Sequence, residues 1–189
     1  MGIRQATAEY RTLRDTIRER GTRRVTLFWA GLTAWAVLRL AAQALDPDVY
    51  LTLVSLAALA AAFEAVYALH VSVERIGRYL QVFYEETGTL PAWEYTAMAL
   101  GRGVPAGATD PLFSRMFGIA AVLNLAPGLL AAPPVPLALV LLAHLLFGVR
   151  LLQARRYAAR QREQDLRRFQ ELHKAVAGVS PEPSSRTAH

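Results

Sequence analysis

Four stretches of this 189-residue chain are almost continuously apolar, and charged sequence lies before, between and after them. The first two stretches are residues 25–45 and 47–73. Only Asp46 separates them, and the second stretch starts with a proline that can begin the next helix. A proline-rich turn separates the other two, residues 111–131 and 137–154. As helices with ~1.5 Å of rise per residue, these stretches are about long enough to cross the hydrocarbon core of a membrane. The pattern therefore predicts four transmembrane helices in two hairpins.

The second apolar stretch continues into charged sequence without any residue that would end a helix. A helix over residues 47–86 would be ~60 Å long, which is about twice the thickness of the hydrocarbon core. Apolar residues from Leu69 to Phe83 recur at alternating spacings of four and three residues, so they share one helical face. We expect this helix to leave the membrane and to bury that face against other helices.

Both ends of the chain carry a basic amphipathic pattern. Apolar residues from Ile3 to Ile17 form one stripe among arginines, and Leu166, Phe169, Leu172 and Val176 mark a similar helix near the other end. These helices and the segment after the second span together predict a cytosolic helical cap.

The predicted fold class is all-α: an integral membrane protein with four transmembrane helices in two hairpins and a cytosolic helical cap. The predicted segments follow in chain order: a cytosolic basic helix (1–24), transmembrane helices 1 and 2 (25–45 and 47–73), a cytosolic helical extension with a short helix and loop (74–110), transmembrane helices 3 and 4 (111–131 and 137–154), a cytosolic basic helix (155–177) and a disordered tail (178–189).

Composition and charge support this layout and predict its orientation. The chain is 53% hydrophobic and 19% charged, with a mean hydropathy of +0.23, which is typical of a small membrane protein with polar ends. It has no cysteine, which excludes disulfides and thiolate metal sites. All but one of the 21 lysine and arginine residues lie on the side predicted to be cytoplasmic, and the exception is Arg39. By the positive-inside rule, both termini are cytoplasmic, and we expect a bacterial inner membrane.

Ionisable or strongly polar residues inside the predicted spans are the first candidates for a functional site, because hydrocarbon makes such groups costly. They are Arg39, Glu64, Asn124 and His144. Asn124 and His144 each lie ~12 Å from the outer turn of the second hairpin, which predicts a hydrogen bond between them. Glu64 lies ~21 Å deep and Arg150 at a similar depth. We expect Glu64 to face the bundle and to pair with Arg150, which would hold the two hairpins together.

Two further groups of residues are weaker candidates. His70 and Glu74 are one helical turn apart, a spacing that metal ligands use, but no second pair completes a site, so we expect no metal and no cofactor. The aromatic residues Tyr79, Phe83, Tyr84 and Trp93 suit either a partner surface or the core of the cap, and the apolar stripes of the terminal helices favour the core.

The sequence favours a non-enzymatic scaffold or regulator that acts through its cytosolic cap. One alternative is a small oligomeric transporter or channel that uses Glu64 and the layer of Asn124 and His144. Another is a membrane-embedded enzyme built on His70, Glu74 and other cytosolic carboxylates. We expect the arginine-rich segments to contact anionic lipid headgroups rather than nucleic acid, and the partner to be a second copy of the chain or another membrane protein.

Overall fold

The computed structural model describes residues 3–45, 49–85, 111–131 and 133–179, and every one of them except Pro133 is helical. The elements are the α-helices α1 (Ile3–Leu45), α2 (Val49–Leu80), α4 (Pro111–Ala131) and α5 (Pro134–Val179), with a π-helix η1 (Gln81–Glu85) that extends α2. The short helix predicted between residues 89 and 100, Trp93, and the tail from residue 180 lie outside the described residues.

The helices are longer than the segments that the sequence predicts. α1 is unbroken at residues 24 and 25, and α5 is unbroken at residues 154 and 155, so each predicted basic helix continues a predicted span as one helix. The last helix also begins at Pro134 rather than at Leu137, and the backbone N–H of Leu137 donates to Pro133 O at 2.9 Å. Proline is tolerated in a first turn because the backbone N–H groups there have no partner within the helix.

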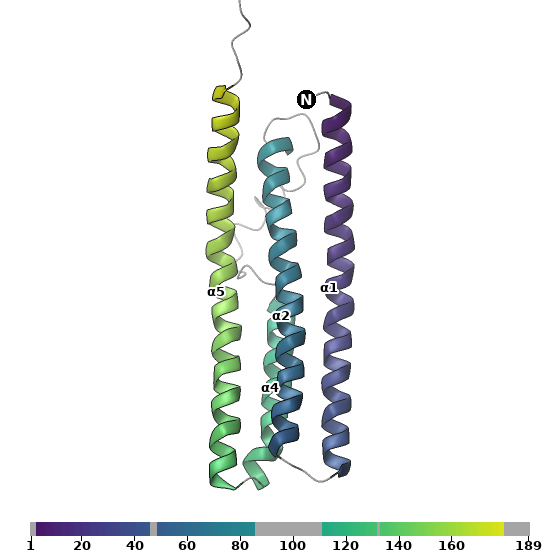
Figure 1. Cartoon of the computed structure of the whole chain (residues 1–189), viewed down its shortest axis with the longest axis vertical. Helices are drawn as coiled ribbons and strands as arrows, with labels where there is room; N and C mark the ends of the chain where they lie inside the picture. The colour runs from purple at the N-terminus through teal and green to yellow at the C-terminus, as the bar shows by residue number, and fades with distance from the viewer. Residues whose placement is uncertain (1–2, 46–48, 86–110, 132, 180–189) are drawn as a thin grey trace, which may run out of the picture.

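α2 lies at the centre of the bundle (Figure 1). α1 and α5 flank it, and α4 packs behind the half of α2 that contains its N-terminal end. The N-terminal end of α1 and the C-terminal end of α5 lie at the same end of the molecule, beyond the end of α4 (Figure 1). Of the described helices, α4 therefore lies in only one half of the bundle, whereas α1, α2 and α5 run through both.

Three of these helices are long and apolar enough to cross a membrane: α1, α2 with η1, and α5. α4 carries a shorter apolar segment, Phe113–Leu129. The structure thus has the all-helical class and the apolar helices that the sequence predicts. By length and composition, three of these helices are candidate spans, whereas the sequence predicts four.

The two halves of the bundle differ in composition, and they are named here by their described residues. The apolar half comprises residues 25–45, 49–73, 113–131 and 133–152, and the charged half comprises residues 7–24, 74–85 and 153–176. Large apolar side chains cover the outside of the apolar half: Leu40 on α1, Val122 on α4 and Leu145 on α5 are 67%, 67% and 64% exposed. An apolar exterior of this extent is typical of a surface that faces lipid.

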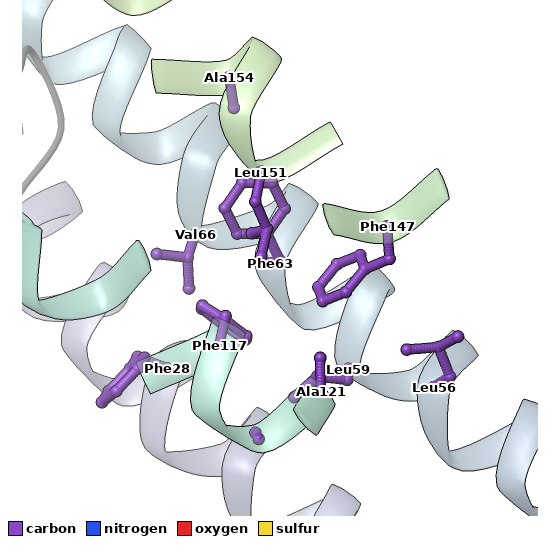
Figure 2. Packing of buried hydrophobic residues seen from close by; sticks show 11 residues of the cluster. Phe28, Leu56, Leu59, Phe63, Val66, Phe117, Ala121, Phe147, Leu151 and Ala154 are labelled. Atoms are coloured by element: carbon purple, nitrogen blue, oxygen red, sulfur yellow. The ribbon is translucent and has the colours of Figure 1, made fainter. Parts of the chain in front are cut away.

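An aromatic cluster packs the interior of the apolar half (Figure 2). The rings of Phe117 on α4 and Phe147 on α5 meet Phe63 on α2 edge to face, with centroids 5.4 and 6.0 Å apart. Phe28 on α1 meets Phe117 in the same way at 5.6 Å. Edge-to-face contacts of this kind add to the attraction between helices. The cluster therefore joins all four helices near the boundary with the charged half.

α1 and α2 approach each other closely at Gly31. A Cβ atom added to Gly31 would lie 2.3 Å from Cβ of Ala62, which is far inside van der Waals contact. Small residues allow helix backbones in membranes to pack closely, because lipid gives no hydrophobic drive for association. Gly31 and Ala62 thus set the spacing of the first two helices.

Candidate functional site

A layer of polar side chains crosses the interior of the apolar half, with Asn124 of α4 at its centre. Asn124 is fully buried. Its Oδ1 accepts hydrogen bonds from Trp35 Nε1 of α1 at 3.2 Å and from Ser55 Oγ of α2 at 2.7 Å. Its Nδ2 donates to the backbone oxygen of Thr52 on α2 at 3.0 Å and contacts His144 Nε2 on α5 at 3.1 Å. One amide side chain therefore connects all four helices.

The hydrogen-bond pattern fixes the orientation of the amide and the tautomer of the histidine. Trp35 Nε1 can only donate, so the atom of Asn124 that it meets must be the oxygen. His144 Nδ1 lies 2.8 Å from the backbone oxygen of Val140 and must donate to it, which leaves Nε2 to accept from Asn124. Both hydrogens and both lone pairs of the Asn124 amide have partners, and so do both ring nitrogens of His144.

The predicted contact between Asn124 and His144 is therefore present, but it is only part of the layer. The layer is completed by Trp35, Thr52 and Ser55, which are not among the candidates that the sequence predicts. A signal was available: Thr52 and Ser55 are hydroxyl residues within an apolar run, three residues apart and so on one helical face. Trp35 also carries an N–H that needs an acceptor when it is buried.

Arg39 lies next to this layer on α1, one turn beyond Trp35. It is half-buried, and its Nη1 donates to Thr52 Oγ1 at 3.4 Å. Arg39 thus adds a second contact between α1 and α2 at the edge of the layer.

Glu64 and Arg150 form the ion pair that the sequence predicts between α2 and α5. Arg150 Nε and Nη2 contact the two carboxylate oxygens of Glu64 at 2.7 and 2.8 Å, a two-point geometry that guanidinium and carboxylate groups favour. The Arg150 guanidinium also lies 5.2 Å from the ring centroid of Tyr67 on α2. The role of this pair in holding the hairpins together stays a prediction.

The expected orientation of Glu64 was wrong. The side chains of Glu64 and Arg150 are 46% and 38% exposed, so the pair lies on the outer surface of the bundle rather than in its interior. The reason is the rotation of α2: Phe63 and Val66 point into the aromatic cluster, and Glu64 lies on the opposite face.

A second polar network lies in the charged half around Arg78 of α2. Arg78 is almost completely buried, and it donates to Glu74 Oε2 at 3.0 Å and to Gln81 Oε1 at 3.1 Å. Arg162 of α5 contacts the same Glu74 oxygen at 3.0 Å. Nearby, Arg75 and Asp165 pair between α2 and α5 at 3.3 Å. These ion pairs connect α2 to α5 along the charged half.

Aromatic side chains form the core of the charged half. Phe169 of α5 packs edge to face on Tyr79 and Phe83, with centroids 5.7 and 6.3 Å apart. Tyr84 of η1 is buried and lies 5.8 Å from the ring of Tyr10 on α1. The candidate partner surface of Tyr79, Phe83 and Tyr84 is therefore largely a core, because the flanking helices cover it.

Glu9 of α1 accepts a hydrogen bond from Tyr79 at 3.0 Å in this core. Burial raises the pKa of Tyr79 above its usual value, and the hydrogen bond to Glu9 raises it further. Tyr79 and Tyr84 both have a raised pKa, chiefly from burial. Both phenols therefore remain protonated donors at neutral pH.

His70 and Glu74 have other partners than a metal ion. Glu74 contacts two arginines, and His70 Nδ1 accepts a hydrogen bond from Arg24 of α1 at 2.9 Å. Arg24 also stacks over Phe113 of α4, 5.0 Å from its ring centroid. A cavity of about 20 Å³ lies beside these side chains, which is room for one water molecule.

Among the described residues, no three histidine, aspartate or glutamate side chains are grouped so that they could hold a metal ion. Comparison with protein-family models, with curated proteins and with solved structures gives no match for this chain. What the protein does must therefore be inferred from the two networks and from the arrangement of the helices.

Proposed function

We propose that this chain is a four-span membrane protein that acts as a non-enzymatic scaffold, with the charged half as a stalk beyond the membrane. The observation that supports it most directly is helix continuity. α1, α2 with η1, and α5 pass from apolar to charged sequence without a break, and the charged half has its own core and ion pairs. A stalk built in this way holds its surface at a fixed distance from the membrane.

The fourth span in this proposal is α4. Its apolar segment Phe113–Leu129 is ~26 Å long as a helix, at the short end of what crosses a membrane. Apart from Arg115 near its start, its exposed residues are apolar, with Val122 and Leu123 at 67% and 58% exposure. An even number of crossings also agrees with the first and last helix ends lying at the same end of the bundle (Figure 1).

The orientation in this proposal follows the charge. The arginines concentrate in the charged half, so it is the cytoplasmic side of an inner membrane by the positive-inside rule. Arg23 of α1 and Arg155 and Arg156 of α5 are exposed where the apolar half ends. Anionic lipid headgroups at that level are their natural partners.

The alternative function is transport through the polar layer. A transport site must exchange its partners for an ion or a substrate, whereas every donor and acceptor of Asn124 is taken by another helix. Such a layer is better suited to fix the positions of four helices whose lipid-facing surfaces give no directional contacts. We therefore assign it a structural role.

The scaffold proposal is tested by extracting the protein in native lipid nanodiscs and identifying what travels with it by mass spectrometry. Leu172 and Val176 of the stalk are 55% and 65% exposed, one turn apart at the far end of α5. If a partner binds the end of the stalk, replacing both residues with glutamine should reduce the amount of co-extracted partner at least tenfold. Val135→Gln is the matched control, because Val135 is 82% exposed at the other end of the same helix.

Two results would contradict the scaffold. One is that no other protein travels with the chain. The other is a partner that remains with the stalk variant and is lost from the Val135 control. A flux of protons or cations through vesicles that Glu64→Gln abolishes would favour the transporter instead.

A further inference from the structure

Ion pairs on a lipid-facing surface are costly, and the pair of Glu64 and Arg150 lies on such a surface. Glu64 is fifteen residues from the start of α2, which places it ~22 Å along the helix and within the apolar half. The pair is nearly half exposed there. Burial of the pair against another protein surface would remove both charges from contact with lipid.

The surroundings of this pair form a continuous exposed face on two adjacent helices. On α2 the face consists of alanines at helical spacing around Glu64, and on α5 it consists of larger side chains around Arg150. We call it the α2–α5 face, and its residues are Ala57, Ala61, Glu64, Ala68, Leu146, Arg150 and Tyr157.

We propose that a second copy of this chain docks on the α2–α5 face, as a dimer with a two-fold axis parallel to the helices. The axis lies over the α2–α5 face, midway between the two helices and outside the chain. In this arrangement α2 of each copy packs on α5 of the other. Glu64 then lies opposite Arg150 of the second copy, because both copies sit at the same depth in one membrane. Charge complementarity selects this occupant: one chain carries both signs at one level, so two copies satisfy each other.

The shape of the face also fits itself. Glu64 of α2 pairs with Arg150 of α5, which lies 86 residues later in the chain. Residues of α2 and α5 whose numbers differ by 86 therefore lie at about the same level along the two helices. Leu146 therefore lies at the level of Ala60, between the exposed alanines Ala57 and Ala61. In the dimer, Leu146 of one copy packs on the surface that these two alanines leave open. Small residues spaced by four are the usual place of close helix packing in membranes.

Cysteine cross-linking tests this arrangement directly, since the natural chain contains no cysteine. One tagged copy carries Ala61→Cys, a second copy with a different tag carries Leu146→Cys, and both are expressed together and oxidised in membranes. The expected product is a disulfide-linked dimer that carries both tags, at least tenfold above a control pair of Ala34→Cys and Ala126→Cys. The control positions are exposed on α1 and α4, away from the face.

Several results would overturn the proposal. A doubly tagged product no greater than that of the control pair would do so. So would an Ala61→Cys copy that links mainly to itself, since this would place α2 against α2. A main product that contains a different protein would mean that another membrane protein occupies the face.

The particle mass in nanodiscs gives a second measurement, independent of disulfide chemistry. Ala61→Leu fills the space that Leu146 of the second copy needs, so the fraction of dimer should fall at least fivefold. Ala126→Leu makes the same change on exposed α4 and should leave the dimer intact. Both variants keep their helix content by circular dichroism if the change affects association only. A dimer that survives Ala61→Leu would overturn the proposal.

Discussion

The two halves of this bundle share α1, α2 and α5 and both pack aromatic rings in the interior, yet they differ in their buried polar groups and in their outer surfaces. In the apolar half, the layer of Asn124, Ser55 and His144 lies inside and leucine lies outside. In the charged half, Tyr79 and Phe169 lie inside, the interior also holds the side chain of Arg78, and most of the other arginines lie outside. In the proposed arrangement, one set of helices is thus held together in two solvents, lipid and water.

The difference follows from what each solvent offers. In water, packing an aromatic ring removes apolar surface from the solvent, so the charged half gains stability from that burial. In lipid, a leucine gains nothing by moving inside, and helices are held by close packing and by hydrogen bonds that hydrocarbon cannot replace. We therefore expect small residues and buried amides to contribute most to the stability of the apolar half, and aromatic rings to contribute most to that of the charged half.

The largest effect is expected at Gly31, where α1 and α2 approach each other closely. Gly31→Leu should destabilise the bundle by about 3 kcal/mol, since even a Cβ atom would overlap Ala62. Gly148→Leu is the control, because a Cβ atom at Gly148 meets nothing within 4 Å. Thermal unfolding in nanodiscs measures both. Equal stability of the two variants would mean that close packing does not hold the first two helices.

The next effect concerns the polar layer. Asn124→Leu keeps the branched shape and the number of heavy atoms but leaves Trp35 Nε1 and His144 Nε2 without their partner, at a cost of about 2 kcal/mol. A double-variant cycle with His144→Leu should show that the two losses are not additive. Full additivity would contradict a connected layer.

The sequence predicts how deep a residue lies along its helix better than it predicts which way the helix is rotated. The regular rise of a helix gives depth, so the Asn124–His144 and Glu64–Arg150 contacts follow from counting residues from the turns. Rotation about the helix axis depends on packing with neighbours, which is why Glu64 was expected to face inward. The same limit hid Trp35, because nothing in the pattern of α1 tells which side meets α4.

The extent of the helices follows from local chemistry. No proline lies at the junctions where α1 and α5 change between charged and apolar sequence, and Gly21, one turn before the junction in α1, does not end that helix. Separate segments were predicted there because composition changes abruptly, but a change of solvent does not break a helix. Contacts such as Arg162 with Glu74 join residues 88 apart in the sequence and could not be predicted from it.

A smaller effect is expected in the charged half. Phe169→Ala removes the ring that packs on Tyr79 and Phe83, and because Phe169 is only half-buried the cost should be about 1.5 kcal/mol. Hydrogen exchange should increase at residues 79–85 while the apolar half keeps its protection. Faster exchange throughout the bundle would mean that the halves are not separately stabilised.

The smallest effect is expected for the exposed ion pair. Glu64→Arg places two positive charges together and should lower the unfolding temperature, and adding Arg150→Glu should restore it by reversing the pair. Because the long side chain of Arg150 can extend its charged end toward the lipid headgroups, the contribution of the pair should be smaller than that of Asn124. A double variant no more stable than Glu64→Arg alone would show that the pair does not hold α2 and α5 together.

In the proposed arrangement, four helices cross the membrane and three of them continue as a cytoplasmic stalk. Single-cysteine variants labelled with a membrane-impermeant maleimide in oriented vesicles test it most directly. The account predicts labelling from the cytoplasmic side at Ser114 and Gln164, labelling from the outer side at Val135, and no labelling at Leu145. Labelling of Ser114 and Val135 from the same side would contradict it, because α4 would then not cross the membrane.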